Sequence, residues 1–159
     1  MDIRVGYGYD IHRLEKGEYL LLAGEKIPSP YKTVAHSDGD ILLHALSQSL
    51  LSAVGLEDIG TYFPDSKEST LGLDSKNILA FALGKVKEAG YQISNTVIDI
   101  VLEKPKLLPY KSTIKKAVSH LLNLDESRIA VHANTSEKVG PVGKEEAITV
   151  TVTTLVIKN

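Results

Sequence analysis

Three of the five histidines fall within the first 44 residues, near two short acidic motifs. Asp10 and His12 are two residues apart, so in an extended chain their side chains leave the same face, about 6.5 Å apart at Cα. His44 lies about one turn inside a predicted helix. Two imidazoles and a carboxylate make three protein ligands, and zinc held in this way keeps its fourth tetrahedral position for water or substrate. These residues predict an open metal site.

The donor types alone decide neither which metal would bind nor whether these residues form a metal site. Nitrogen and carboxylate ligands favour Zn²⁺ but also suit Mn²⁺, Fe²⁺ or Co²⁺. The chain has no cysteine, which excludes both a thiolate zinc site and a disulfide framework. A plainer interpretation exists for each motif, because an Asp-x-His pair is often a solvated strand end and a helix histidine is often a surface group. From the residues alone, both interpretations stand.

Two further motifs carry polar side chains suited to anions. Asn134-Thr135-Ser136-Glu137-Lys138 combines hydroxyls, a carboxylate and an ammonium on one predicted turn, a mixture that suits phosphate and Mg²⁺ or simply a solvated turn. Lys104-Pro105-Lys106 could contact an anion or be ordinary surface. Gly6-x-Gly8 lacks the third glycine of a dinucleotide fingerprint, and there is no Walker lysine motif, so NAD and P-loop functions are excluded.

Length and composition predict one soluble domain over residues 1–159. The chain is 43% hydrophobic and 24% charged, and no stretch approaches the roughly 20 apolar residues of a membrane span. A net charge of −2 argues against nucleic acid as a partner. The first residues resemble a strand rather than a secretory signal, so we expect a cytoplasmic protein of bacterial type; a processed plastid form would look the same.

The first predicted strand covers residues 3–12. Its apolar residues share one parity: Ile3, Val5, Tyr7, Tyr9 and Ile11. This alternation predicts that the apolar face packs against the core and that the opposite face carries Asp10 and His12.

The remaining pattern predicts a mixed sheet covered by helices. After a second apolar run at 19–23, Pro28-Ser29-Pro30 is expected to begin a loop, and residues 56–73 are expected to form a long loop that acts as a lid. Helices are expected at 41–54, 75–89 and 109–122, and further strands at 96–102, 128–133 and 147–157. The order β, β, α, α, β, α, β, β predicts an α+β domain.

Several motifs together resemble the 2-C-methyl-D-erythritol 2,4-cyclodiphosphate synthase family. They are Gly6-Tyr7-Gly8-Tyr9-Asp10-Ile11-His12, Ala35-His36-Ser37-Asp38-Gly39-Asp40, Leu43-His44-Ala45-Leu46, Asp58-Ile59-Gly60, Phe63-Pro64-Asp65, Asp74-Ser75, Pro105-Lys106 and Thr135-Ser136-Glu137-Lys138. The resemblance runs nearly end to end. It implies a lyase of the non-mevalonate isoprenoid pathway that converts 4-diphosphocytidyl-2-C-methyl-D-erythritol 2-phosphate into the 2,4-cyclodiphosphate and releases CMP. The substrate's own 2-phosphate attacks the β-phosphorus, so no water is consumed.

The resemblance also implies two metal ions and two polarising residues. Asp10, His12 and His44 would hold Zn²⁺, or Mn²⁺ or Co²⁺ in its place. Glu137 would be the protein ligand of Mg²⁺ or Mn²⁺ bridging the substrate diphosphate. His36 and Thr135 match catalytic positions that polarise the phosphates.

The implied substrate contacts fall into groups along the chain. His36 and Ser37 match substrate-binding positions, Asp58 and Gly60 match those around the ribose, and the segment Leu102 to Leu108 matches the cytosine pocket. The full set is Asp10, His12, His36, Ser37, Asp58, Gly60, Phe63, Pro64, Asp65, Ser66, Lys67, Leu102, Lys106, Leu107, Leu108, Asn134, Thr135, Ser136, Glu137 and Lys144. Phe63 to Lys67 match a flexible loop over the methylerythritol.

The family forms homotrimers with active sites between subunits, so the resemblance implies that the zinc ligands and the cytidine pocket of one site come from different chains. This chain departs from the commoner pattern at Gln48, where Asp is frequent, and at Pro141 and Lys144, where Phe and Arg are frequent near the threefold axis. Those two changes put binding of a prenyl phosphate on the axis in doubt. The spacing of Asp40 and His44 predicts that Asp40 orients this ligand.

Two other functions remain as alternatives. In a metal-dependent phosphoesterase acting on a nucleotide-like substrate, the same three ligands would activate water and give linear products. A nucleotide-binding or structural metal module would lose its metal and its folding stability together when His44 is replaced by alanine.

Overall fold

The computed structural model describes residues 1–159 as an α+β domain, as predicted. Its strands are β1 (Ile3–Lys16), β2 (Tyr19–Leu22), β3 (Glu25–Pro28), β4 (Tyr31–Val34), β5 (Tyr91–Val101), β6 (Ile129–Asn134) and β7 (Ala147–Lys158). Its helices are α1 (Ile41–Ala53), α2 (Ile59–Tyr62), α3 (Ser75–Glu88), α4 (Lys111–Leu122) and α5 (Gly140–Gly143), with 3₁₀ turns at Glu68–Thr70, Leu108–Tyr110 and Glu126–Arg128.

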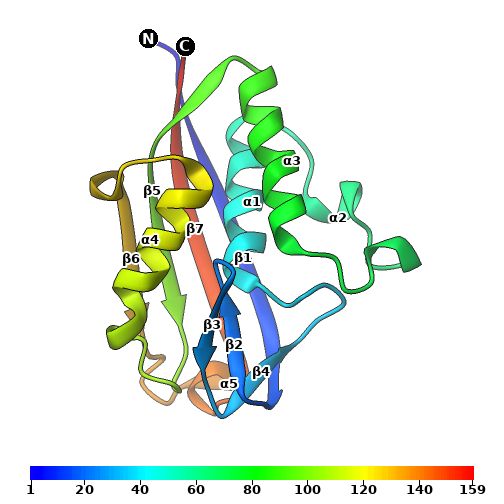
Figure 1. Cartoon of the computed structure of the whole chain (residues 1–159), viewed down its shortest axis with the longest axis vertical. Helices are drawn as coiled ribbons and strands as arrows, with labels where there is room; N and C mark the ends of the chain where they lie inside the picture. Colours follow the sequence, from blue (N-terminus) through cyan, green and yellow to red (C-terminus); the bar gives the residue numbers. More distant parts are fainter.

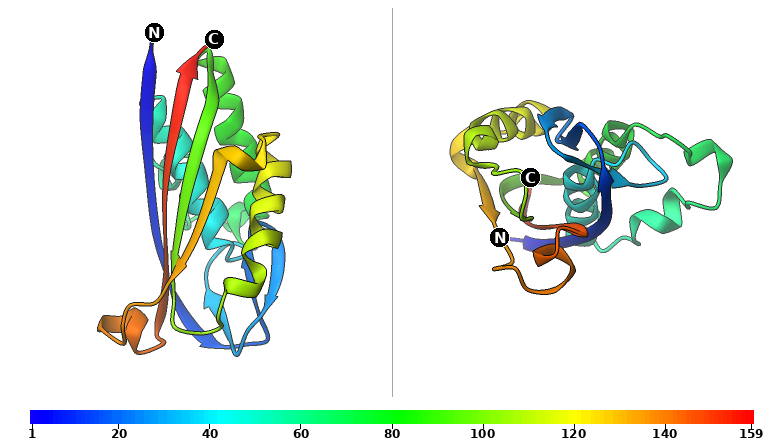
Figure 2. Two further views of the ribbon diagram at one scale, coloured as in Figure 1. Left: turned by 90° about the vertical axis from the view of Figure 1, so that its left-hand side faces the viewer. Right: turned by 90° about the horizontal axis from the view of Figure 1, so that it is seen from below.

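Five strands form one mixed sheet in the order β4-β1-β7-β5-β6 (Figure 1). Only β5 and β6 are parallel, and the connection between them carries α4. The strands β2 and β3 form a separate hairpin. The three long helices lie on the same face of the five-stranded sheet (Figure 2). None of the helices is long and apolar enough to cross a membrane.

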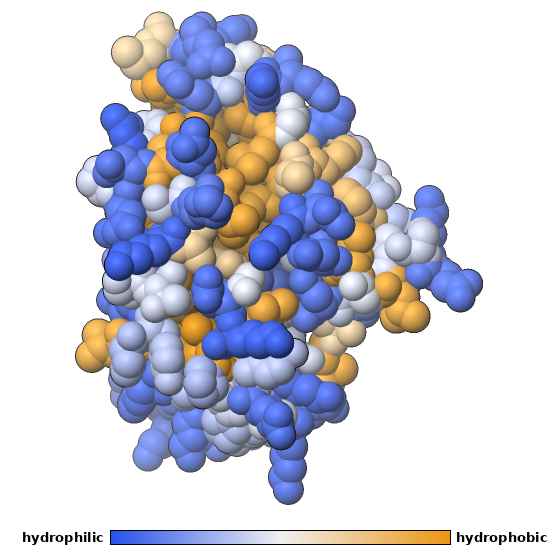
Figure 3. All heavy atoms as spheres, viewed as in Figure 1, coloured by the Kyte–Doolittle hydropathy of each residue, from blue (hydrophilic) through white to orange (hydrophobic).

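The core lies between this face of the sheet and α1. Nearly every residue of α1 is buried, and its leucines and Ile41 pack against strand residues such as Val150 and Val152. Apolar side chains are also visible between α3 and α4, bordered by hydrophilic ones (Figure 3). The carboxylate of Asp40 caps α1 by accepting a hydrogen bond from the backbone N–H of Leu43.

The prediction that the apolar face of β1 packs against the core was wrong, whereas Asp10 and His12 lie on the opposite face as predicted. Ile3, Val5 and Tyr7 are 49%, 62% and 57% exposed, so the predicted core face is uncovered in this chain. The opposite face packs on α1 through Gly6 and Gly8. A Cβ on Gly8 would lie only 1.9 Å from the carbonyl oxygen of Ala45, so the missing side chain lets helix and strand approach closely.

The segment around the two prolines was also predicted incompletely. Residues 25–34 contain two short strands, β3 and β4, and only Ser29 and Pro30 stand between them. Both prolines sit outside strand interiors, where their missing N–H removes no ladder hydrogen bond. The predicted long loop at 56–73 contains α2 and a 3₁₀ turn. Each is too short for a periodic sequence pattern to reveal.

Candidate metal centre

The close packing of α1 on β1 brings three potential ligands together. Asp10 and His12 leave β1 on the glycine side, as the i, i+2 spacing predicts, just beyond Gly8. His44 lies in the first turn of α1, and its ring contacts the Asp10 carboxylate. Two features of the sequence therefore position the site. The alternation of side chains along β1 places Asp10 and His12 on one face, and Gly6 and Gly8 on that face let α1 pack close to the strand.

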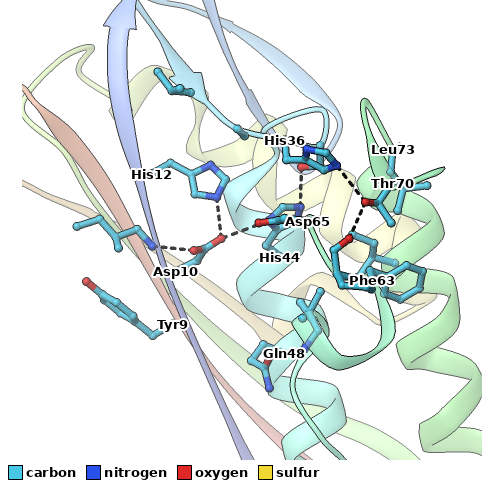
Figure 4. Close-up of a pocket in the computed structure, with 18 residues that line it drawn as sticks. Tyr9, Asp10, His12, His36, His44, Gln48, Phe63, Asp65, Thr70 and Leu73 are labelled. Atoms are coloured by element: carbon cyan, nitrogen blue, oxygen red, sulfur yellow. Dashed lines mark hydrogen bonds and ion pairs between the residues drawn. The ribbon is translucent and has the colours of Figure 1, made fainter. Parts of the chain in front are cut away.

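The three side chains converge on one point (Figure 4). Oδ2 of Asp10 lies 2.9 Å from Nε2 of His12 and 3.3 Å from Nδ1 of His44. One donor atom from each residue lies within 4.8 Å of the other two. Burial raises the pKa of Asp10, but hydrogen bonds from His12 and His44 outweigh it and lower the pKa to about 2. The carboxylate is therefore ionised and ready to bind a cation.

The donor set fits a divalent metal ion. Two imidazole nitrogens and one carboxylate oxygen are zinc ligands, and no fourth His, Cys, Asp or Glu joins them. Ser37 Oγ lies 3.0 Å from Nε2 of His44 and so holds that ring from behind. Nδ1 of His12 is buried without a hydrogen-bond partner, so its ring lacks such support.

The three residues open into a cavity of about 560 Å³. Eight of the predicted substrate-binding residues line it: Asp10, His12, His36, Ser37, Gly60, Phe63, Pro64 and Asp65. Asp58 caps α2 by accepting from the N–H of Thr61, and Ser66 and Lys67 belong to the same loop beside the cavity. Five residues of the segment 58–67 thus line the same cavity as the candidate metal centre.

Eight other residues of the cavity wall were not predicted as site residues from the sequence. They are Tyr9, Ile11, Val34, Ala35, Ile59, Thr70, Leu73 and Ile78. Gln48 also lines the cavity, and its side-chain oxygen accepts a hydrogen bond from the N–H of Ile59. Thr70 and Leu73 carry no spacing signal, because loop closure brings them to the wall.

The remaining predicted residues form a second group that does not line this cavity. Leu102, Lys106, Leu107 and Leu108 follow β5, and Lys144 follows α5. Asn134 is the last residue of β6, and Thr135 to Glu137 follow it. Glu103 connects the segment after β5 to the segment after β6, since its Oε1 accepts hydrogen bonds from the backbone N–H groups of Ser136 and Lys138. Pro141 lies inside α5.

The predicted role of Asp40 was wrong, because its carboxylate does not contact the ring of His44. It accepts instead from the backbone N–H groups of Ala23, Gly24 and Leu43, joining the β2–β3 turn to α1. Burial raises the pKa of Asp40 to about 6, despite these three hydrogen bonds. Ser37 is the residue that holds His44.

Fold and site together define an α+β protein with an open Asp-His-His candidate metal centre at a cavity. The sequence pattern of the YgbB family matches residues 3–157. The chain belongs to this family.

Several relatives of this chain share one name. The 2-C-methyl-D-erythritol 2,4-cyclodiphosphate synthase of Ectopseudomonas mendocina is 40% identical over 156 residues, which are 98% of this chain and 99% of the relative. A solved structure of such a synthase with CDP bound has a TM-score of 0.89 at 38% identity, over 97% of this chain and 100% of the other. The IspF–CDP complex from Plasmodium falciparum has a TM-score of 0.86 at 36% identity, over 99% of this chain and 97% of the other. The resemblance inferred from the motifs is confirmed.

Proposed function

We propose that this chain converts 4-diphosphocytidyl-2-C-methyl-D-erythritol 2-phosphate into 2-C-methyl-D-erythritol 2,4-cyclodiphosphate and releases CMP. The observation that carries the proposal is the convergence of Asp10, His12 and His44 at an open cavity in a chain of this family. Relatives at about 40% identity are named for this synthase. We further propose that residues 1–159 form one catalytic domain acting in the cytoplasm.

The chain's own residues would fold the substrate back on itself, so that its 2-phosphate reaches the β-phosphorus. His36 and Ser37 line the cavity beside the centre and would bind phosphate oxygens. A metal ion held by Asp10, His12 and His44 would polarise a phosphate oxygen when bound. Phe63, Pro64 and Asp65 form the cavity wall that would limit water. Positioning and charge stabilisation account for such a transfer without a protein nucleophile.

The proposed resident ion at the Asp-His-His centre is Zn²⁺, with Mn²⁺ or Co²⁺ as alternatives. Its support is the donor set of two imidazoles and one carboxylate. We propose Glu137 as the protein ligand of a second ion, Mg²⁺ or Mn²⁺, on the substrate diphosphate, and Thr135 as the residue that polarises a phosphate there.

We propose that the second group of residues completes the site from a neighbouring subunit. In the register of the sheet, Val101 pairs with Thr149, and Thr149 pairs with Ile11. Both groups therefore lie at the same level along the strands, while β1 and β6 lie three places apart in the sheet. A rotation axis along the strands would bring the β6 side of one copy to the β1 side of the next.

The uncovered face of β1 supports a homotrimer as this assembly. Ile3, Val5, Tyr7, Tyr9 and Ile11, here called the apolar β1 face, are each about half exposed or more. A continuous apolar stripe of this kind marks an interaction site in most soluble proteins. Burial of the apolar β1 face between three copies would place Leu102, Lys106, Leu107 and Leu108 at the cytosine. Asp58 and Gly60 would lie opposite them, at the ribose. The solved relatives with CDP bound support a cytidine nucleotide as the ligand.

Phosphorus NMR tests the function directly. The purified protein is incubated with the cytidylyl substrate, with Zn²⁺ and Mg²⁺ supplied or with chelator. We expect the cyclic diphosphate and CMP with metals and neither with chelator. Absence of the cyclic product with both metals present would refute the proposal, and linear phosphate products would support the phosphoesterase instead.

The metal-module alternative is tested by His44→Ala. An open catalytic centre predicts a folded protein without turnover, because the core of α1 does not depend on this half-buried ring. A structural metal site predicts that unfolding accompanies the loss of metal. Thermal unfolding of the variant and of the metal-stripped wild type decides between them.

A further inference from the structure

The hydroxyl of Thr70 connects the cavity loop to the ring of His36. Thr70 Oγ1 lies 3.0 Å from Nε2 of His36 and 2.8 Å from the carbonyl oxygen of Pro64 (Figure 4). It also lies 2.7 Å from the carbonyl oxygen of Lys67. We propose that Thr70 is a positioning residue that fixes the orientation of His36 and couples it to the loop at 64–70. The proposal rests on the proposed function only for the role of His36 towards the substrate.

The donors and acceptors around Oγ1 allow one arrangement. The two carbonyl oxygens only accept, so the single hydroxyl hydrogen of Thr70 points at one of them. Oγ1 is then left as an acceptor, and Nε2 of His36 must supply the hydrogen. The carbonyl oxygen of Lys67, 3.3 Å from Nε2, also only accepts and favours the same assignment. His36 therefore carries its hydrogen on Nε2, turned towards the loop.

Its second nitrogen is thereby left for the substrate. Nδ1 of His36 makes no hydrogen bond within the chain, and the residue lines the same cavity as the metal centre. Because Nε2 is committed to Thr70, the ring is held in one orientation and cannot exchange its two nitrogens. Thr70 thus leaves Nδ1 as the ring atom of His36 that would contact a phosphate of the substrate.

The backbone supports this link from the same side. The N–H of Gly72 donates to the carbonyl oxygen of His36 at 2.8 Å, and the N–H of Asp38 donates to that of Leu73 at 3.1 Å. The segment that follows Thr70 therefore pairs with the segment that holds His36. Thr70 itself is only 9% exposed, so water does not replace its hydroxyl easily. Loop and ring form one hydrogen-bonded unit.

A matched pair of variants isolates the hydroxyl. Thr70→Val keeps the shape of the side chain but removes the hydroxyl, whereas Thr70→Ser keeps the hydroxyl. In ¹⁵N-labelled protein at about pH 8, we expect the ring of His36 to show a single tautomer with hydrogen on Nε2 in the wild type and in the serine variant. The valine variant is expected to show a mixture. Amide exchange of Lys67 and Thr70 should be about tenfold faster in that variant.

Two outcomes would overturn the proposal: a His36 tautomer unchanged by valine, or equal changes in the valine and serine variants, which would indicate packing rather than the hydroxyl. Should the valine variant fail to fold, Thr70→Ala provides the same test without steric demand. These readouts need no substrate, so they hold or fail separately from the proposed reaction.

Turnover provides the functional arm. With the cytidylyl substrate, Thr70→Val is expected to lower kcat about tenfold and to change KM by less than about threefold, because an oriented His36 matters most to the developing charge. Thr70→Ser should restore most of the rate. A valine variant with wild-type kcat would overturn the proposed role in catalysis. If the wild type itself forms no cyclic product, the proposed function fails while the tautomer result still stands.

Discussion

Ser37 Oγ lies 3.0 Å from Nε2 of His44, while Nδ1 of the same ring lies 3.3 Å from the Asp10 carboxylate. The two ring nitrogens are thus divided between a hydroxyl and the metal centre. A hydroxyl both donates and accepts, so Ser37 can pair with Nε2 whether or not Nδ1 carries a hydrogen. Such support behind a ligand fixes the ring and strengthens metal binding.

Replacement of Ser37 by alanine should therefore weaken metal binding even without substrate. We expect the affinity for Zn²⁺ to fall by about tenfold, since Nε2 of the metal-bound ring loses its acceptor. Ser37→Thr, which keeps the hydroxyl, is the matched control. Competition with a chromophoric chelator measures both. An alanine variant that binds Zn²⁺ as tightly as the threonine variant would show that the contact does not support the centre.

Gly8 is predicted to be essential for the approach of α1 to β1. Its added Cβ in Gly8→Ala would lie 1.9 Å from the carbonyl oxygen of Ala45, so the helix must move. We expect the free energy of unfolding to fall by roughly 2 kcal/mol or more, with weaker metal binding because His44 moves away from Asp10.

Gly84→Ala is the control for this prediction. Gly84 lies in α3, and a Cβ there meets nothing within 4 Å. The substitution should stabilise the protein by about 0.5–1 kcal/mol through helix propensity. Urea unfolding compares the two variants. Equal effects at both positions would contradict the close packing inferred at Gly8.

The sequence was sufficient to name Asp10, His12 and His44 as candidate metal ligands that the fold brings together, because strand alternation and helix spacing are local rules. It was not sufficient to orient β1. Alternation divides a strand into two faces, but which face a helix covers depends on tertiary packing. The glycines at positions 6 and 8 were the available signal, since two small residues on one face allow a helix to approach.

The roles of Asp40 and Thr70 lay beyond such rules. Asp40 is one turn from His44, so their spacing favoured a contact between the two side chains. The Asp40 carboxylate instead accepts hydrogen bonds from three backbone N–H groups, two in the β2–β3 turn and one at the start of α1. Thr70 reaches His36 only because the loop folds back across 34 positions. Contacts of this range follow from the assembled fold.

The raised pKa of Asp40 predicts a pH-dependent stability. In the unfolded chain this carboxyl titrates near 3.8, and burial raises its folded pKa to about 6. Between these values the folded state binds more protons than the unfolded state, so stability falls as the pH rises from about 4 to about 6. A shift of this size corresponds to roughly 2–3 kcal/mol.

Asp40→Asn should remove this contribution to the slope, whatever its effect on absolute stability through the altered cap. Urea unfolding between pH 4 and pH 7 compares the variant with the wild type. The wild type is expected to lose more stability than the variant across this range. Parallel curves would show that Asp40 is not the titrating group.

The apolar β1 face predicts assembly that a single charge disrupts. Val5 is 62% exposed in the chain by itself, so Val5→Glu leaves the monomer's core intact. Inside a trimer the same glutamate would be buried without a partner, at a cost of several kcal/mol per copy. We expect sedimentation analysis to give a trimer for the wild type and a monomer for the variant, with unchanged secondary structure. Leu71, 66% exposed in the cavity loop, is the matched control, and Leu71→Glu should remain a trimer.

Because the proposed site needs residues from two copies, Val5→Glu should lose synthesis of the cyclic product yet still bind Zn²⁺. A monomeric variant with full activity would contradict the composite site while leaving the metal centre itself in place.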